Sequence, residues 1–381
     1  MNKIEHNINV LIPDGDRVHV LEVIRCLAID KKIKIHVLSS KNWVKPRFSR
    51  YISSFTLIPP NLTEQETIEV LKQNILTKKI DVLLPVYVDK IRFLSKYIST
   101  FKSLTNLIIP NLESFDIAND KLELARFLGK KNINKPITYE LDELNQIKGN
   151  INFPVILKPV YGIGGEGVQK VSNAKDLDEK IKQINSNEKY IVQNYIKGFD
   201  LGMSVLCQEG KILAYTIQKG TINKVGSYQS PISVQFLDEE EVYNSVEKMM
   251  SELNWSGVAN VDFRYDEVEK SYKILEINPR YWGSLEASEK VGVNFPYLQC
   301  LTSLGIDFKM PSFQHEAFAK KSGMLRIIKS KISLKNDSHE FPKYSTIKAD
   351  ILDPAPKITM AILKILKILK ILKILKILKL G

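Results

Sequence analysis

Two strand-like segments between residues 258 and 280 constrain the fold most, because each sorts its side chains onto two faces. The polar residues of one face are Asn260, Asp262 and Arg264 in the first segment, and Glu276, Asn278 and Arg280 in the second. The polar run 266–271 between the segments predicts a hairpin loop. A hairpin centred near residue 269 places Asp262 directly opposite Glu276.

The facing acids favour a cation site. Two carboxylates opposite each other across a strand pair repel. A hard divalent cation would remove this repulsion and take oxygen ligands from Asp262, Glu276 and Asn278, a set that suits Mg²⁺. Arg280, two residues further along, is placed to hold a phosphoryl group during transfer. The alternative is a half-buried hairpin with a solvated polar face.

A glycine-rich turn follows the expected strand 153–158. The turn contains Gly162, Gly164, Gly165 and Gly167. Glycines let the backbone approach a ligand closely, and successive N–H groups in such a turn can cradle phosphate oxygens. Lys158 ends the preceding strand and supplies a positive charge for those phosphates. The alternative is a tight β-hairpin that needs glycines only for its turn.

The segment 190–200 is an apolar strand that breaks at Gly198. Backbone groups near Asn194 and Ile196 are placed to pair with the edge of a purine. Asp200 is placed to accept hydrogen bonds from ribose hydroxyls. A strand end with a solvated acid explains the same residues if the segment is taken alone.

Short apolar strands alternate with helices over roughly the first 110 residues. The expected strands are 7–13, 33–38, 55–59 and 81–85, and the expected helices are 19–30 and 64–77. This alternation predicts a parallel α/β layer. The first turn, 13–17, lacks the GxGxxG pattern, so a dinucleotide site is not favoured.

The pattern changes after residue 118. Asn119 or Asp120 is expected to cap a helix that runs to about Lys130. Further expected strands are 153–158, a strand ending at 171, 190–195, 201–207, 212–218 and the hairpin, with helices at 176–184, 240–253 and from 284. Strands with segregated helices predict an α+β body. Residues 309–358 show no clear pattern.

These motifs, taken in this order, resemble the ATP-grasp superfamily. The order is Asn119-Asp120-Lys121, Lys158 with its glycine turn, the segment 193–200, and then the hairpin. Glu276 to Arg280, followed by Gly283-Ser284, looks most like the carbamoyl-phosphate-synthase and biotin-carboxylase branch. The resemblance covers about residues 1–305. It implies an α/β N-terminal domain followed by an α+β ATP-grasp domain pair. The expected divisions are 1–112, 113–305 with a lid at about 135–195, a C-terminal extension 306–358 and a tail 359–381.

The resemblance also implies a role for each matching residue. Lys121 and Lys158 would hold ATP phosphates, and the turn Gly162, Gly164, Gly165 and Gly167 would close over them. Gln193, Asn194 and Ile196 would meet the adenine, and Asp200 the ribose. Asp262, Glu276 and Asn278 would bind Mg²⁺ (or Mn²⁺), and Arg280 would stabilise the transferred phosphoryl group. Lys219 is a weaker candidate for the γ-phosphate. This chain has Gln193-Asn194 where many members carry a glutamate, and Gly165-Glu166 where serine is common.

The implied function is that of a cytoplasmic ligase. Mg-ATP would activate a small-molecule carboxylate as an acylphosphate, and an amine or similar nucleophile would displace phosphate. An ATP-grasp kinase and a non-catalytic ATP-binding protein are the alternatives. The substrates would meet residues 14–17, 87–90 and 221–231, which carry no signature of a particular compound. A homodimer is the assembly that the family suggests.

Charge and cysteine content exclude some other functions. The net charge is +12, and six of the lysines belong to an Ile-Leu-Lys repeat at 361–381, which leaves a moderate +6. No Lys/Arg patch with interleaved aromatic residues is evident in the body, so no nucleic-acid partner is expected. Three widely spaced cysteines, Cys26, Cys207 and Cys300, predict neither a disulfide framework nor a metal site.

The Ile-Leu-Lys repeat makes a poor amphipathic helix. Residues three apart are rotated by about 300° on an α-helix, so the lysines spiral round the axis. A membrane span is disfavoured, because each central lysine costs roughly 2.5–3.5 kcal/mol on insertion. Weak contact with an anionic membrane surface through extended lysine side chains is one interpretation. The other is a slipped short DNA repeat without a selected role.

Overall fold

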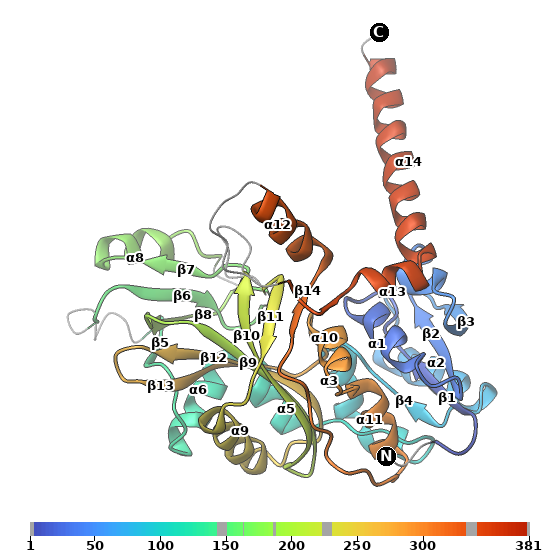
Figure 1. Ribbon diagram of the computed structural model, residues 1–381, viewed down its shortest axis with the longest axis horizontal. Coiled ribbons are helices and arrows are strands. Elements are labelled where there is room, and N and C mark those ends of the chain that lie inside the picture. Colours follow the sequence, from blue (N-terminus) through green and yellow to red (C-terminus); the bar gives the residue numbers. More distant parts are fainter. Residues whose placement is uncertain are drawn as a thin grey trace. The chain divides into compact units, whose positions relative to one another are not determined.

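The computed structural model of the chain has two compact units (Figure 1). It describes residues 4–142, 151–162, 164–185, 188–222, 231–332 and 341–378. The first unit comprises Met1–Leu107, Cys300–Phe308 and Thr346–Gly381, and the second Ile108–Gln299 and Lys309–Ser345.

The first unit is built on a parallel sheet with the strand order β3-β2-β1-β4. Its strands are β1 (Ile8–Ile12), β2 (Ile33–Ser39), β3 (Ile52–Leu57) and β4 (Val82–Leu83). Its helices are α1 (Val20–Leu27), α2 (Glu64–Thr77), α3 (Val88–Lys96), α4 (Ile98–Lys102), α13 (Ile347–Leu352) and α14 (Ala355–Leu378), with the 3₁₀ turn η1 (Lys45–Phe48). The parallel pairing agrees with the α/β layer expected from the sequence.

Local sequence explains where these elements begin. Thr63 accepts a hydrogen bond from the Glu66 N–H and Glu66 bonds back to the Thr63 N–H, a capping box that starts α2 at the predicted residue. The β-branched and leucine residues of β1 are all buried, as expected for a strand covered on both faces. β1 lies between β2 and β4, so the strand order reverses at this point of the sheet.

The second unit contains a seven-stranded sheet with the order β13-β12-β9-β10-β11-β14-β15. Its strands are β9 (Asp200–Gln208), β10 (Lys211–Ile222), β11 (Ser233–Phe236), β12 (Gly257–Asp266), β13 (Ser271–Asn278), β14 (Ala317–Ala319) and β15 (Tyr344–Ser345). The helices of this unit include α5 (Leu112–Asn119), α6 (Lys121–Lys130), α9 (Glu240–Glu252), α10 (Leu285–Lys290) and α12 (Lys321–Ile332), and α11 (Phe295–Ser303) passes into the first unit. The antiparallel pair β9–β10 and the β12–β13 hairpin confirm the predicted pairings.

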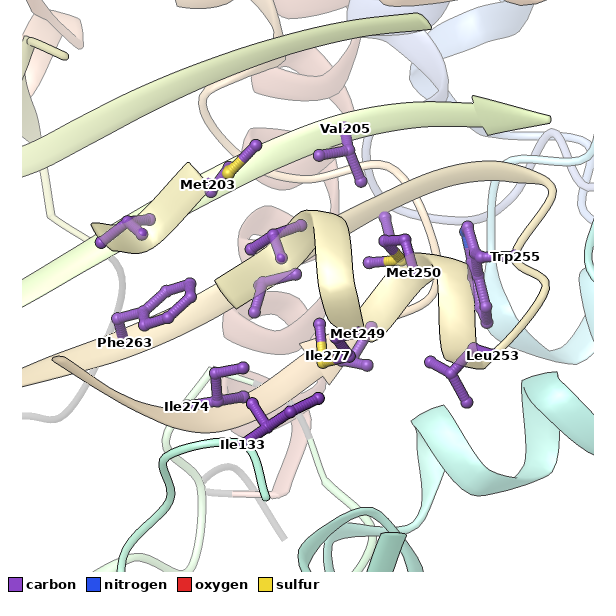
Figure 2. Packing of buried hydrophobic residues seen from close by; sticks show 14 of the residues in the cluster. Ile133, Met203, Val205, Met249, Met250, Leu253, Trp255, Phe263, Ile274 and Ile277 are labelled. Carbon is purple, nitrogen blue, oxygen red and sulfur yellow. The ribbon is translucent and has the colours of Figure 1, made fainter. Parts of the chain in front are cut away.

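One face of this sheet is apolar and is covered by α5, α6 and α9. Figure 2 shows Met249 and Met250 of α9 against Met203 of β9 and Phe263 of β12, with Trp255 at the end of the cluster. Because side chains alternate along a strand, the neighbours of these residues on β9 and β12 face the opposite side. That opposite face carries the polar side chains described below.

A second, four-stranded sheet in this unit has the order β5-β8-β6-β7. Its strands are β5 (Thr138–Glu140), β6 (Val155–Pro159), β7 (Gln169–Val171) and β8 (Tyr190–Asn194), and α8 (Ala174–Ile181) packs on it. Val155, Leu157 and Val192 form its core with Leu177 of α8. The glycine turn joins β6 to β7, so the predicted order of strand, glycine turn and strand is confirmed.

Residues 361–378 of the Ile-Leu-Lys repeat lie within α14, a single helix of 24 residues. Every helix in the described ranges is too short or too polar to pass through a bilayer. The three cysteines are buried and free, in agreement with the sequence.

Candidate functional site

The β12–β13 hairpin brings Asp262 directly opposite Glu276, as the sequence predicts. Asn278 lies on the same face, and its Nδ2 donates to Asp262 Oδ2 at 2.9 Å and to Glu276 Oε1 at 3.3 Å. Asn260 Nδ2 donates to Asp262 Oδ1 at 2.7 Å. The side-chain amides of Asn260 and Asn278 thus donate to the two facing carboxylates, and these hydrogen bonds fix the positions of the carboxylate oxygens.

Two lysines from other elements approach these carboxylates. Asp120 caps α6 by accepting from two of its N–H groups, and this places Lys121 at the first position of the helix. Lys121 Nζ lies 3.3 Å from Glu276 Oε2. The same Nζ donates to the carbonyl oxygens of Val160 and Gly162, at 3.3 and 3.4 Å, and so reaches the start of the glycine turn.

The charges of the cluster shift one another's pKa values. Burial lowers the pKa of Lys158, a β6 residue that is only 6% exposed, to about 8, although Glu276 opposes this shift. Burial and the charge of Glu276 raise the pKa of Asp262. Burial alone would raise the pKa of Glu276 as well, but Lys121 and Lys158 outweigh it and hold that pKa below its usual range. The arrangement thus holds Glu276 ionised and makes a second negative charge at Asp262 costly.

This donor set fits a hard divalent cation. Asp262 and Glu276 supply carboxylate oxygens, and a positive charge between them would offset the repulsion that raises the pKa of Asp262. Among the described residues no group of three or more His, Cys, Asp or Glu side chains could hold a metal ion. A cation here would therefore complete its shell with Asn278, water or phosphate oxygens, as Mg²⁺ usually does.

Arg280 lies beside this donor set and is largely buried. Its Nη2 donates to Asn278 Oδ1 at 3.0 Å, and its Nη1 donates to the Tyr281 carbonyl at 2.8 Å. These bonds fix the plane of the guanidinium next to the carboxylates. The structure thus brings Arg280 together with Asp262, Glu276 and Asn278, as the alternation of the strand predicts.

The glycine turn has backbone angles that favour glycine. Gly164, Gly165 and Gly167 have φ values of +64°, +77° and +74°. A Cβ on Gly164 would meet no atom within 4 Å, so conformation and not space selects glycine there. Gly162 is also left-handed in φ, at +157°. Tyr161 is bonded to the cap of α6 through Asp120 Oδ2 at 2.6 Å. The turn therefore starts from a fixed point next to Lys121.

The segment predicted to meet a nucleoside runs from the end of β8 to the first residue of β9. Gln193 is buried and its Nε2 donates to Thr138 Oγ1 at 2.9 Å. Asn194 Oδ1 is buried and accepts no hydrogen bond from the described part of the chain. A buried acceptor of this kind is expected to meet a donor, and an N–H of a ligand would serve.

Arg264 joins the remaining two residues of that segment. Its Nε donates to the Ile196 carbonyl at 3.1 Å, and its Nη1 lies 2.7 Å from Asp200 Oδ1. Asp200 faces the same side of the sheet as Asp262, because β9 and β12 pair with Gly202 opposite Asp262 and Asp200 opposite Arg264. The sequence placed Arg264 on this face but assigned it no role.

Lys219 is not brought together with the cluster. Its Nζ lies 3.6 Å from the centroid of the Phe199 ring. Strand alternation puts Lys219 on the same face as Ile217, which belongs to the apolar core. The neighbouring Gln218 faces the site instead: its Nε2 donates to Ser284 Oγ at 2.7 Å, and its Oε1 is buried without a partner among the described residues.

Comparison with known proteins identifies this arrangement. Residues 118–284 match the family model described as an ATP-grasp domain. The carbamoyl phosphate synthase large chain of Thermoanaerobacter sp. (strain X514) is 24% identical over 192 residues, which cover 47% of this chain and 18% of that protein. This chain therefore spans about a fifth of the length of that relative.

Solved structures have the same fold. An L-amino acid ligase from Bacillus licheniformis matches with a TM-score of 0.62 at 18% identity, covering 81% of this chain and 76% of that one. The biotin carboxylase domain dimer of the Hydrogenobacter thermophilus 2-oxoglutarate carboxylase, in complex with MgADP, ADP and bicarbonate, matches with a TM-score of 0.62 at 17% identity, covering 81% and 73%. At these identities the likeness concerns the fold alone.

The likeness to ATP-grasp proteins is thus found in residues 118–284, the segment that holds Lys121, Lys158, Asp262, Glu276 and Arg280. The predicted resemblance to the carbamoyl-phosphate-synthase and biotin-carboxylase branch is confirmed by these matches.

Proposed function

We propose that this chain is an ATP-grasp ligase that joins a small-molecule carboxylate to an amine or similar nucleophile. One observation carries the proposal: a half-buried pair of facing carboxylates, Asp262 and Glu276, lies beside Lys121, Lys158 and Arg280. A nucleoside triphosphate with a divalent cation matches this arrangement of charges, since the cation suits the carboxylates and the phosphates suit the cationic side chains.

The reaction follows from positions and charges. A substrate carboxylate oxygen attacks the γ-phosphorus; a new P–O bond forms, the bond to the β-phosphate oxygen breaks, and ADP leaves. The amine then attacks the carbonyl carbon of the acylphosphate; a C–N bond forms, the C–O bond to phosphate breaks, and the amine proton passes to solvent or phosphate. Arg280 is placed to stabilise the charge of the transferred group.

Different residues would bind the phosphates, the adenine, the ribose and the metal ion. Lys121 and Lys158 would hold phosphates, with N–H groups of Gly164, Gly165 and Gly167 closing over them. Asn194, Gln193 and the Ile196 carbonyl would meet adenine, and Asp200 the ribose. A bound Mg²⁺ (or Mn²⁺) would neutralise phosphate charge during transfer, held by Asp262, Glu276 and Asn278. The MgADP named for the Hydrogenobacter structure supports this assignment.

The carboxylate and amine would be selected outside the nucleotide pocket. The turn after β1 and the start of α3 offer suitable groups, because Arg17 lies 2.6 Å from Asp89 and its guanidinium lies over the Tyr87 ring. The third predicted recognition loop, 221–231, lies mostly outside the described residues. A cytoplasmic location, a homodimer and the domain divisions 1–112, 113–305, 306–358 and 359–381 are further parts of this proposal.

The first test is ADP release from Mg-ATP against a panel of carboxylate and amine pairs. The full chain is compared with Glu276→Gln, and Glu179→Gln on the exposed side of α8 is the matched control. We expect release that needs both co-substrates and falls by ~10²-fold or more in Glu276→Gln, with the control unchanged.

The other outcomes separate the alternatives. A stable phosphorylated product formed without any amine would show a kinase. Mg-ATP binding without turnover in any mixture would favour a binding protein, and equal rates for Glu276→Gln and the full chain would remove the proposed metal site.

A further inference from the structure

The C-terminal helix of the first unit exposes apolar side chains together with an excess of positive charge, of which only Lys357 is paired among the described residues, with Asp350 of α13. Residues 355–381 contain seven lysines and no Asp or Glu: Lys357, Lys364, Lys367, Lys370, Lys373, Lys376 and Lys379. Five of the isoleucines and leucines between them are 48% to 56% exposed, and Leu363 is half-buried. The five are Ile362, Ile365, Leu366, Ile368 and Leu369. A helix with this surface requires a partner that accepts both apolar area and cations.

The base of this helix is held firmly. Asp353, fully buried just before α14, accepts from Ser49 Oγ at 2.8 Å and from the Arg50 N–H at 3.0 Å. Arg25 pairs with Asp350 of α13 at 3.1 Å. These bonds tie α14 to the η1 region, and the helix extends beyond it (Figure 1).

The η1 region has the same character as α14. Residues 41–51 contain four basic side chains and no acid: Lys41, Lys45, Arg47 and Arg50. Trp43 is 58% exposed among them and stacks on Phe48 with ring centroids 5.9 Å apart. This is a Lys/Arg patch with interleaved aromatic residues, so the expectation that the body of the chain has none was wrong. Tryptophan beside basic residues is typical of proteins that contact the membrane–water interface.

The spacing of the lysines decides which partner fits. A second protein helix needs an apolar seam that recurs every 3.5 residues, and the three-residue repeat turns its apolar positions away from any such seam. A lipid surface has no fixed seam: acyl chains accept isoleucine and leucine at any angle, and lysine side chains extend to reach headgroups. Anionic headgroups would supply the negative charges that residues 355–381 lack.

We propose that α14 and residues 41–51, called here the C-terminal basic surface, dock on a bilayer that contains anionic phospholipid. The helix lies at the headgroup level with its lysines on lipid phosphates, and Trp43 enters the interface beside its base. This inference is independent of the proposed ligase reaction, since it involves none of the residues placed in the nucleotide site.

Tryptophan fluorescence offers a specific test. The chain has three tryptophans, and Trp255 and Trp282 are 0% and 4% exposed, so Trp43 alone is available to a vesicle. Vesicles of phosphatidylcholine with roughly a quarter of phosphatidylglycerol, which gives them an anionic surface, are added to the full chain. We expect a blue shift of the emission and quenching by brominated acyl chains. Trp43→Phe should abolish both signals while the chain still floats with the vesicles.

Charge variants test the helix itself. In the triple variant Lys364, Lys367 and Lys370 are each replaced by Gln, and the matched control replaces the exposed Lys182, Lys211 and Lys309 in the same way. Each lysine near an anionic surface contributes about fivefold to partition, so the first variant should bind ~100-fold more weakly. The control should bind like the full chain, and both should keep ADP release unchanged.

Four results would overturn the proposal. The first is no flotation with anionic vesicles, and the second is equal loss in the control triple, which would show that net charge alone is responsible. The third is concentration-dependent self-association through α14 without vesicle binding. The fourth is duplex DNA binding at the same salt concentration with no change in Trp43 emission on vesicle addition, which would identify a polyanion site.

Discussion

Lys158→Met should make the chain more stable while it removes nucleotide binding. Lys158 is buried in β6 and its pKa is about 8, whereas an unfolded lysine titrates near ~10.4. Below pH 8 both the folded and unfolded states carry the proton, so folding bears the full cost of burying the charge. Methionine has similar length and no charge, and it should pack against the apolar residues of the same sheet.

The size of the effect follows from the two pKa values. Their difference corresponds to ~3 kcal/mol, and relaxation of the site reduces the expected gain at pH 7 to about 1–3 kcal/mol. Above pH 8 the unfolded state binds more protons than the folded one, so the stability of the natural chain should rise between pH 8 and ~10.4 through this group. Lys158→Met should lack that rise.

Urea unfolding at pH 7 and pH 9.5, with and without Mg-ATP, measures both parts. Trp255 and Trp282 are buried in the second unit and report on its unfolding. Nucleotide at about 100 times its Kd should stabilise the natural chain by ~2.7 kcal/mol and the variant hardly at all. Lys211→Met, at an exposed strand start, is the control and should change stability by less than ~0.5 kcal/mol.

The reasoning is refuted if Lys158→Met is less stable than the natural chain at pH 7. It is also refuted if the variant keeps the full stabilisation by Mg-ATP. Either result would mean that the lysine is satisfied by its protein neighbours and does not serve a ligand.

Three further predictions concern other parts of the chain. Burial raises the pKa of Asp14 to about 7. The free energy of unfolding of the natural chain should therefore fall as pH rises from ~4 to ~7, because the unfolded state loses the proton first. Asp14→Asn should lack this fall, so urea unfolding should find it more stable than the natural chain by up to ~4 kcal/mol at the upper end of that window. Met250→Ala, in the core under α9, should lower the free energy of unfolding by about 2–5 kcal/mol without changing the Kd for Mg-ATP measured by calorimetry. Gly198→Ala places a Cβ 1.8 Å from the Tyr265 carbonyl oxygen, so it should destabilise the chain by about 1–3 kcal/mol and weaken Mg-ATP binding by displacing the segment next to Asp200.

The hairpin and its facing acids could be predicted because the signals are local. Alternation fixes which side chains share a face, and the polar loop fixes the approximate centre of the hairpin. The pairing of Asp262 with Glu276 also needs the register shift between Asp262 and Phe263, which residue counting did not predict. The cap that places Lys121 follows in the same way from Asp120. The boundaries of α2 and α6 were predictable because capping residues mark their starts.

Features that depend on distant parts of the chain were not predictable. β11 and β14 pair across some 80 residues, and neither carries an alternating pattern long enough to stand out. Gln218 and Lys219 are neighbours in a strand, and only the placement of the apolar core decides which of them faces the site. The lysine was the more natural choice for a phosphate ligand, but the sheet turns it toward Phe199.

The cluster around Glu276 shows why a chain keeps charges that weaken it. Asp262 facing Glu276 is unfavourable by itself, and so is the burial of Lys158. Lys121 lies against Glu276 and stabilises its charge, and the charge of Glu276 in turn partly offsets the burial of Lys158. Under the proposed function each of these side chains has an alternative partner: a cation for the carboxylates, and phosphates for Lys121, Lys158 and Arg280. When Mg-ATP binds, each charged side chain would exchange a partner within the protein for a partner in the ligand, and no charge would be left unpaired. A set of apolar replacements would fold more easily, but it would offer nothing to Mg-ATP, so the instability of the site follows from the ligand for which it is arranged.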